Sequence, residues 1–219
     1  MTKLILIRHA EALGNITRRF QGQIDADITE NGTRQLEKLG EKMKDTPIDI
    51  IYSSDLMRAQ KTAQAVRGDR NIDIIIEKKL REIDGGDWED VPFEDLPEKW
   101  SAEYDVWCHD PANHQMPGGE SMRDVEKRMV EAIGEIVDQN KGKTVCITSH
   151  GTALKVFMTV ARGWELERIN NVMWYENTAV TCIDVDDDGV FDIVTEGDDS
   201  HLPDELATLK KQTWWKDTQ

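Results

Sequence analysis

Short hydrophobic runs alternate with amphipathic stretches along most of the chain. Residues 4–7 are four consecutive aliphatic side chains, and similar apolar runs recur at 48–54, 71–82 and 143–151. Runs of this length and composition are typical of strands that are buried on both faces. Between these runs, apolar side chains recur at helical spacing, most clearly in the stretch that follows Ser121. The pattern therefore predicts strands that alternate with helices.

Capping residues predict where several of these helices begin. Thr29 is expected to cap a helix whose apolar face carries Leu36, Leu39 and Met43, and Ser54 is expected to cap the helix over residues 54–66. Ser121 and Asp124 have the spacing of a capping box at the start of a long helix that ends before Gly142.

The last third of the chain predicts one more helix and two more strands. An apolar helix is expected over about 152–161, directly after the fourth strand. Two strands are expected to flank the acidic sequence DVDDDG at 184–189, and the last twenty residues are predicted to form a surface tail.

The order of these elements predicts the fold class. Alternating strands and helices favour an α/β fold in which a mostly parallel sheet lies between two helical layers, a three-layer sandwich. The whole chain, residues 1–219, is expected to form one domain. Residues 84–118 are the least regular part, rich in Trp, Pro and acidic side chains, and we interpret them as a lid or pocket wall.

The composition argues against some classes of binding partner. The formal net charge is −16, which argues against a nucleic acid or an anionic membrane as partner, since basic surfaces bind both. An anionic substrate must then be held by a local basic cluster. Three scattered cysteines, Cys108, Cys146 and Cys182, together with the lack of a signal peptide and of any transmembrane stretch, predict a cytoplasmic protein.

Two predicted strands each deliver a histidine at the carboxyl end. LILIRH ends in Arg8 and His9, and VCITSH ends in His150, which Gly151 follows. Because the carboxyl ends of parallel strands share one edge of a sheet, we expect the two histidines to lie close together. A guanidinium at the end of a core strand is costly unless an anion meets it.

Two further side chains extend this candidate site. Arg58 lies near the start of the predicted 54–66 helix, where the helix dipole favours anions, so the helix end and Arg58 can bind one phosphate. The alternative is a local ion pair between Arg58 and Asp55. Glu82 leaves an extended segment just before Gly85 and Gly86, and a lone Glu at such a place is most often a solvated carboxylate.

Several motifs, in this order along the chain, resemble those of one enzyme family. They are RHAEALGN, FQGQIDADITENG, YSSDLMRAQKTA, LREIDGGDWE, PGGES and SHG. Together they resemble the histidine phosphatase superfamily, in the branch of the cofactor-dependent phosphoglycerate mutases and their phosphatase relatives. The resemblance implies a phosphoglycerate mutase-like fold whose mostly parallel sheet contains one antiparallel strand.

The resemblance also implies the roles of the site residues. His9 would be the nucleophile that carries the phosphoryl group, and Glu82 the proton donor. Phosphoryl transfer depends mainly on positioning and charge neutralisation, which cationic side chains can supply without a metal or other cofactor. The residues implied to grip the phosphate are Arg8, Arg58 and His150, and those implied to contact the substrate are Asn15, Gln21, Gly22 and Gly151.

These observations predict a metal-independent phosphatase that acts on a small phosphorylated metabolite through phosphohistidine. A cofactor-dependent phosphoglycerate mutase is the nearest alternative, although the segment between Glu82 and Pro117 is short, as in the phosphatase branch. A catalytically silent phospholigand sensor is the non-enzyme alternative. Ala12 and Asp90 depart from the family pattern and leave the substrate open. The oligomeric state is open as well, with a homodimer as one alternative.

Two sequence motifs resemble metal-binding sites, but neither is expected to bind a metal ion. DVDDDG matches the first half of a calcium-binding loop, but Thr195 stands where the closing acid is needed, so a hairpin turn is expected there. Cys108, His109 and His114 do not have the spacing of a standard zinc site.

Overall fold

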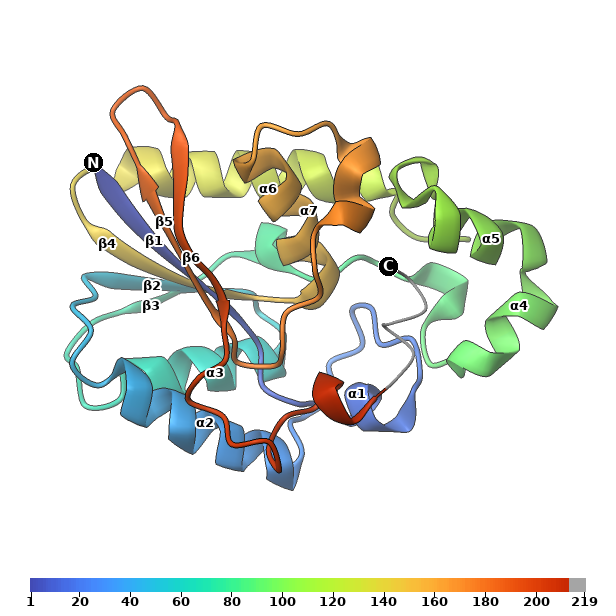
Figure 1. The fold of residues 1–219 in the computed structure, drawn as a ribbon, viewed down its shortest axis with the longest axis horizontal. Helices are drawn as coiled ribbons and strands as arrows, with labels where there is room; N and C mark the ends of the chain where they lie inside the picture. Colours follow the sequence, from blue (N-terminus) through green and yellow to red (C-terminus); the bar gives the residue numbers. More distant parts are fainter. Residues whose placement is uncertain (213–219) are drawn as a thin grey trace.

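A six-stranded sheet lies at the centre of the computed structural model, which describes residues 1–212 (Figure 1). Its strands are β1 (Thr2–Arg8), β2 (Ile50–Ser53), β3 (Ile74–Ile76), β4 (Thr144–Ser149), β5 (Val180–Val185) and β6 (Phe191–Asp198). The strand order is β3-β2-β4-β1-β5-β6. Neighbours among β1 to β4 are parallel, and β5 is antiparallel to both β1 and β6. The predicted sheet with one antiparallel strand is confirmed.

Long helices cover both faces of the sheet. Helices α2 (Glu30–Met43) and α3 (Met57–Arg67) pack on one face, and α6 (Met122–Gln139) and α7 (Gly151–Ala161) on the other (Figure 1). Successive side chains of a strand point to opposite faces. Leu4 and Leu6 of β1 therefore join the core under α6 and α7, whereas Ile5 and Ile7 join the core under α2 and α3. This double burial explains the unbroken aliphatic run, and the three-layer prediction is confirmed.

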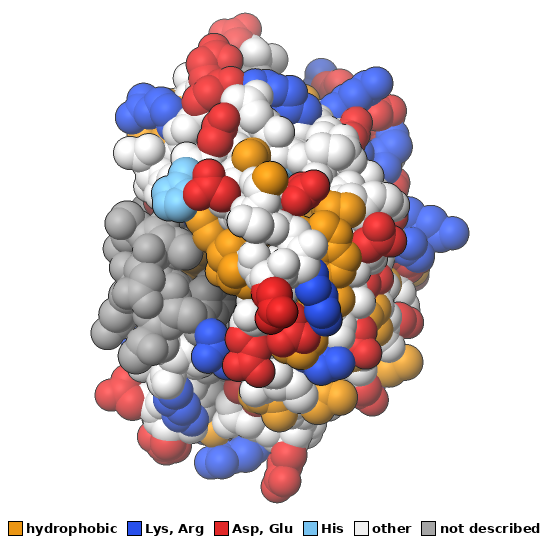
Figure 2. All heavy atoms as spheres, turned by 90° about the vertical axis from the view of Figure 1, so that its right-hand side faces the viewer, with side chains coloured by type: hydrophobic (Ala, Val, Ile, Leu, Met, Phe, Trp, Pro, Cys, Tyr) orange, Lys and Arg blue, Asp and Glu red, His pale blue; other side chains and the backbone are white. Residues whose placement is uncertain are grey.

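Short helices form one end of the molecule, beyond the carboxyl ends of the central strands (Figure 1). They are α1 (Leu13–Thr17), α4 (Leu96–Lys99), α5 (Ser101–His109) and the 3₁₀ helices Lys78–Leu80, Gly86–Trp88, Phe93–Asp95, Pro111–Asn113, Leu166–Asn171 and Leu209–Lys211. Trp88 is fully buried and has the rings of Phe20, Trp100 and Trp107 around it. On the surface of this end, acidic and basic side chains are mixed, and hydrophobic side chains reach solvent between them (Figure 2).

Two predicted helix caps agree with the structure and one does not. The Thr29 hydroxyl accepts the Gly32 N–H at the start of α2, and Ser121 and Asp124 form the predicted capping box of α6. Ser54 does not cap α3, which begins after Leu56. The Ser54 hydroxyl instead contacts the His150 ring, a partner that the local sequence does not reveal. Strand β3 is also shorter than the predicted 71–82 strand.

The C-terminal segment is packed rather than a surface tail over residues 200–212. Leu202, Leu206 and Leu209 are buried, and Thr208 donates a hydrogen bond to the buried Glu11 carboxylate. The prediction of a surface tail is therefore wrong for these residues, because long-range contacts fix a segment with no regular pattern of its own. Residues 213–219 of that predicted tail lie outside the described residues.

The acidic sequence at 184–189 forms the turn between β5 and β6. Asp186 Oδ1 accepts the N–H groups of Asp188 and Val190, and Gly189 has a φ of 82°, which a glycine adopts without strain. The expectation of a hairpin turn is confirmed. Within residues 1–212, no three His, Cys, Asp or Glu side chains are grouped so that they could hold a metal ion.

Candidate active site

The ends of neighbouring strands bring the predicted histidines together. Strands β1 and β4 pair so that Arg8 lies opposite Ser149, and His9 N–H donates to the Ser149 carbonyl at 2.9 Å. The next residue of each chain segment is a histidine, and the two ring centroids are 5.1 Å apart. The parallel register thus explains why residues so far apart in sequence meet at one sheet edge.

Hydrogen bonds to the His9 ring determine which nitrogen can react. Nδ1 lies 2.7 Å from the Ala10 carbonyl, so it carries the proton and donates, which leaves the lone pair on Nε2. The Asn177 amide donates to the His9 carbonyl at 2.8 Å and fixes the backbone. Burial, together with Arg58 and Arg8, holds the pKa of His9 well below its usual value. The ring is therefore neutral at pH 7, as a nucleophile must be.

Arg58 is the second residue of α3 and is only 1% exposed. Its guanidinium donates to the Ile24 carbonyl at 2.7 Å and to the Gly22 carbonyl at 2.8 Å. Burial lowers its pKa to about 10, so it remains a cation at pH 7. Asp55 pairs with Arg81 at 2.6 Å, which removes the alternative of a local Asp55–Arg58 ion pair.

His150 contacts other protein groups through both of its ring nitrogens. Its Nδ1 accepts a hydrogen bond from Arg58 Nε at 3.2 Å, and its Nε2 lies 2.8 Å from the Ser54 hydroxyl. Both ring nitrogens therefore have protein partners, and the ring is fully buried. In this geometry His150 orients Arg58, and direct contact between His150 and a phosphate stays a prediction.

A cavity of about 210 Å³ opens in front of these residues. Eight of the nine predicted site residues, all except His150, line it, namely Arg8, His9, Asn15, Gln21, Gly22, Arg58, Glu82 and Gly151. Within residues 1–212, Arg8 Nε and Gln21 Nε2 are buried donors without a hydrogen-bond partner. Buried donors are nearly always satisfied, so two unpaired ones beside one cavity indicate an anionic or strongly polar ligand.

Glu82 is held against the first turn of α7. One carboxylate oxygen accepts the Ala153 N–H at 3.1 Å and the other accepts the Thr152 N–H at 3.0 Å. A β-carbon on Gly151 would lie 3.1 Å from the Trp174 ring, 3.5 Å from Arg8 Nε and 3.6 Å from Glu82 Oε2. A glycine at this position thus leaves space between these three side chains.

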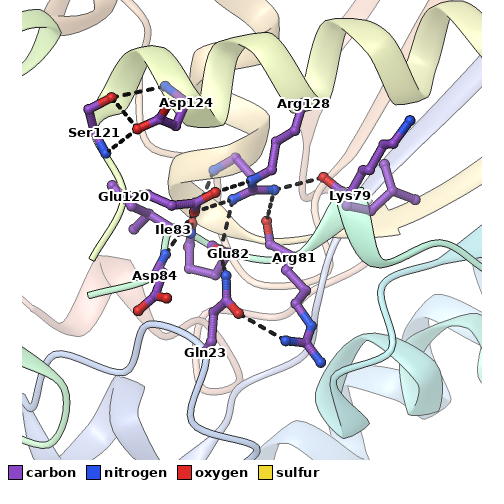
Figure 3. A network of polar contacts seen from close by, with 12 residues as sticks. Gln23, Lys79, Arg81, Glu82, Ile83, Asp84, Glu120, Ser121, Asp124 and Arg128 are labelled. Atoms are coloured by element: carbon purple, nitrogen blue, oxygen red, sulfur yellow. Dashed lines mark hydrogen bonds and ion pairs between the residues drawn. The ribbon is translucent and has the colours of Figure 1, made fainter. Parts of the chain in front are cut away.

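A polar network that the sequence did not indicate fixes the segment that carries Glu82 (Figure 3). Arg128 of α6 donates to the carbonyls of Lys79 at 2.7 Å, Arg81 at 2.6 Å and Glu82 at 3.0 Å. The Glu120 carboxylate accepts from Arg128 Nε at 2.8 Å. Because Arg128 binds backbone carbonyls, no residue type at 79–82 reveals its partner.

Two buried carboxylates tie the C-terminal segment to the site. Glu11 accepts from the Thr208 hydroxyl at 2.7 Å, and Glu176 accepts the Leu209 N–H at 2.8 Å. Thr208 and Leu209 consequently line the cavity. Sequence reasoning missed both acids, because their partners are almost 200 and more than 30 residues away along the chain.

Comparisons with known proteins identify the family. The histidine phosphatase superfamily, branch 1, matches residues 4–199. The chain belongs to this family. It is 32% identical over 168 residues to phosphoserine phosphatase 1 of Hydrogenobacter thermophilus, covering 77% of this chain and 80% of that protein.

Solved structures show the same fold. The YhfR structure from Bacillus stearothermophilus superposes with a TM-score of 0.88 at 36% identity, covering 92% of this chain and 99% of that one. A mutant phosphoserine phosphatase from Entamoeba histolytica, in complex with phosphoserine, gives a TM-score of 0.83 at 29% identity, covering 93% of this chain and 100% of that one.

These comparisons confirm the predicted family, the predicted fold and the predicted enzyme class of phosphatases. Proteins named probable phosphoglycerate mutase also occur among the relatives. The mutase alternative is nevertheless not favoured, because several of the structural neighbours are named as phosphatases.

Proposed function

We propose that this protein hydrolyses small phosphomonoesters through a phosphohistidine at His9 and needs no metal ion. The observation that carries the proposal is the His9 ring, whose free Nε2 lies in a cavity beside the unpaired donors Arg8 Nε and Gln21 Nε2. A neutral nitrogen nucleophile next to fixed cationic donors is the arrangement that phosphoryl transfer requires.

The first step transfers the phosphoryl group to His9. The Nε2 lone pair forms a bond to phosphorus while the bond from phosphorus to the ester oxygen breaks. Arg8 and Arg58 neutralise the charge on the phosphoryl oxygens. Glu82, in its protonated form, gives its proton to the leaving oxygen, and the alcohol departs.

The second step returns the enzyme to its starting state. A water molecule attacks phosphorus, Glu82 takes one of its protons, and the bond from phosphorus to Nε2 breaks. Inorganic phosphate leaves the pocket. His150 supports both steps by holding Arg58 in place.

The proposed substrate class and location rest on further features. Phosphoserine, named for two of the relatives, fits the class of small phosphomonoesters that a cavity of about 210 Å³ can admit.

A cytoplasmic location is supported by three unpaired cysteines, since reducing compartments keep thiols free. None of the helices described combines the length and apolar character that a membrane span needs. A homodimer stays a prediction that sedimentation velocity would test.

Labelling of the phosphoenzyme tests the mechanism. We expect rapid acid quenching with a ³²P-labelled ester to trap an acid-labile phosphoenzyme in the wild type and none in His9→Asn, with phosphate release reduced about 10³-fold or more. Turnover should survive exhaustive chelation. A phosphoenzyme in His9→Asn, or activity that EDTA removes and Mg²⁺ restores, would contradict the proposal. Formation of an isomeric phosphoglycerate without phosphate release would establish the mutase instead.

A further inference from the structure

A lysine outside the proposed catalytic set also lines the cavity. Lys155 lies on α7, one helical turn beyond Gly151 and Thr152, and all three residues line the cavity. Side chains of a helix lean toward its N-terminus, so the Lys155 stem leads back toward the catalytic end. Lys155 takes no part in the proposed two-step hydrolysis.

Among the residues that the structure describes, Lys155 has no anionic partner. The residue is 7% exposed, and its ammonium lies over the Trp174 ring, 4.6 Å from the ring centroid. The chain holds 43 acidic residues, yet none of those described lies within ion-pair distance of Lys155. Burial lowers the pKa of Lys155 to about 8, so the ammonium is still mostly charged at pH 7.

A structural role alone explains this arrangement poorly. The face of an aromatic ring attracts a cation, but it replaces only part of the hydration that a buried ammonium loses. An apolar side chain of similar length would pack against Trp174 without that loss. A buried cation that faces a ligand cavity is explained if a ligand supplies the missing negative charge.

We propose that Lys155, with Trp174 beside it, binds a carboxylate on the leaving group of the substrate. The inference rests on the proposed function, because it places the phosphate of the same molecule at Arg8, His9 and Arg58. Lys155 lies one helical turn beyond Gly151 in the lining of the same cavity, so a short leaving group can join the two sites.

The chemistry of the two cationic sites in the cavity favours a carboxylate at Lys155 over a second phosphate. A single ammonium matches one negative charge. The phosphate end, in contrast, offers guanidinium groups, which match the several oxygens and the higher charge of a phosphate. The enzyme would thus prefer phosphate esters of small hydroxy acids over esters of neutral alcohols.

Binding of two phosphonates that differ only by a carboxylate tests this subsite. The probes are 2-amino-4-phosphonobutanoate and 3-aminopropylphosphonate, which cannot be hydrolysed, and calorimetry at pH 7 measures their affinities. The wild type should bind the carboxylated probe about 10- to 100-fold more tightly, as expected for a charge-assisted hydrogen bond. Lys155→Met should abolish that difference, and Lys155→Arg should keep most of it. Lys141→Met, a surface change of the same charge far from the cavity, should leave it unchanged.

The outcomes separate this inference from the proposed function. Equal affinity of the wild type for both probes, or equal weakening of both by Lys155→Met, overturns the carboxylate subsite. If the wild type shows the preference but releases no phosphate from any ester, the subsite stands and the proposed hydrolysis fails. In turnover, Lys155→Met should raise KM for 3-phosphoglycerate about 10-fold or more and change KM for glycerol 3-phosphate little, with similar kcat.

Discussion

The two ends of the cavity are built in different ways. The phosphate end is built from residues at the ends of core strands and in the first turn of a helix, none of them more than 7% exposed: Arg8, His9, Arg58 and His150. At the opposite end, Phe93, Tyr104, Trp107 and Cys108 come from short helices within residues 84–118. Tyr104 and Trp107 have ring contacts with Trp88, and Phe93 has one with Phe20.

We expect this difference to separate chemistry from selectivity. A phosphoryl group has the same shape in every ester, so a rigid end held by directional hydrogen bonds can serve all substrates. Leaving groups vary, and apolar ring contacts are less directional, so the aromatic end can change without disturbing the nucleophile. Substitutions at the phosphate end should therefore affect kcat, and those at the aromatic end should affect KM.

The largest effect should come from Glu82→Gln, because it removes the proton donor while keeping the shape of the side chain. An alkyl alkoxide is a poor leaving group, so phosphoenzyme formation from such esters should slow by about 10²–10⁴. A nitrophenyl ester expels a stabilised phenolate and should lose much less in this step. Stopped-flow measurements should then show a burst of nitrophenol followed by slow turnover. Equal loss for both esters without a burst would mean that Glu82 only shapes the pocket.

Arg128→Met should resemble a weaker form of Glu82→Gln, since Arg128 positions the backbone of Glu82 rather than its carboxylate. We expect an approximately 10-fold loss of kcat for alkyl esters, a smaller loss for nitrophenyl phosphate, and a free energy of unfolding lower by about 2–4 kcal/mol. Arg123→Met is the matched control on the same helix, because the pair that Arg123 forms within residues 1–212 is an exposed one, with Glu167. If both esters lost the same factor, Arg128 would not act through Glu82.

At the aromatic end, Trp107→Ala should raise KM about 3- to 10-fold, the range expected for the loss of one ring contact, with little change in kcat. Its ring lies 6.0 Å from that of Trp88 and lines the cavity. Trp100→Ala is the matched control, because its ring lies 6.4 Å from that of Trp88 but is not part of the lining. Steady-state kinetics test this expectation. A fall in kcat for Trp107→Ala would contradict the expected division between a phosphate end that affects kcat and an aromatic end that affects KM.

A separate effect, on stability rather than on turnover, should appear in the pH dependence of unfolding. Burial lowers the pKa values of His9 and His150 well below the usual value, so below about pH 6.5 the unfolded chain binds protons that the folded chain does not. The free energy of unfolding should therefore fall as the pH falls, by at most about 1.4 kcal/mol per pH unit for each group. Chemical denaturation of His9→Asn between pH 7 and pH 5 should show a shallower slope. Exposed His109→Asn serves as the control. If the slope of His9→Asn equalled that of the wild type, this assignment would be contradicted.

Local patterns predicted much of the fold and part of the site. The alternation of apolar runs and amphipathic stretches predicted the order of the long elements, and Thr29 and Ser121 marked two helix starts correctly. The placement of His9 and His150 at the ends of parallel strands predicted that they would lie close together. Ser54 shows the limit, because its hydroxyl could cap a helix equally well in sequence but contacts His150 in the fold.

The sequence by itself determined the alternating architecture and the reactive side chains at the strand ends, because periodicity and helix capping depend on residues within one or two turns. Only the tertiary structure decided which nitrogen of His9 is free, how Arg128 fixes Glu82, and that Lys155 is a buried cation facing the cavity. It also decided that residues 200–212 pack against Glu11 and Glu176. These features depend on backbone carbonyls and on partners far along the chain, which no local pattern of residue types encodes.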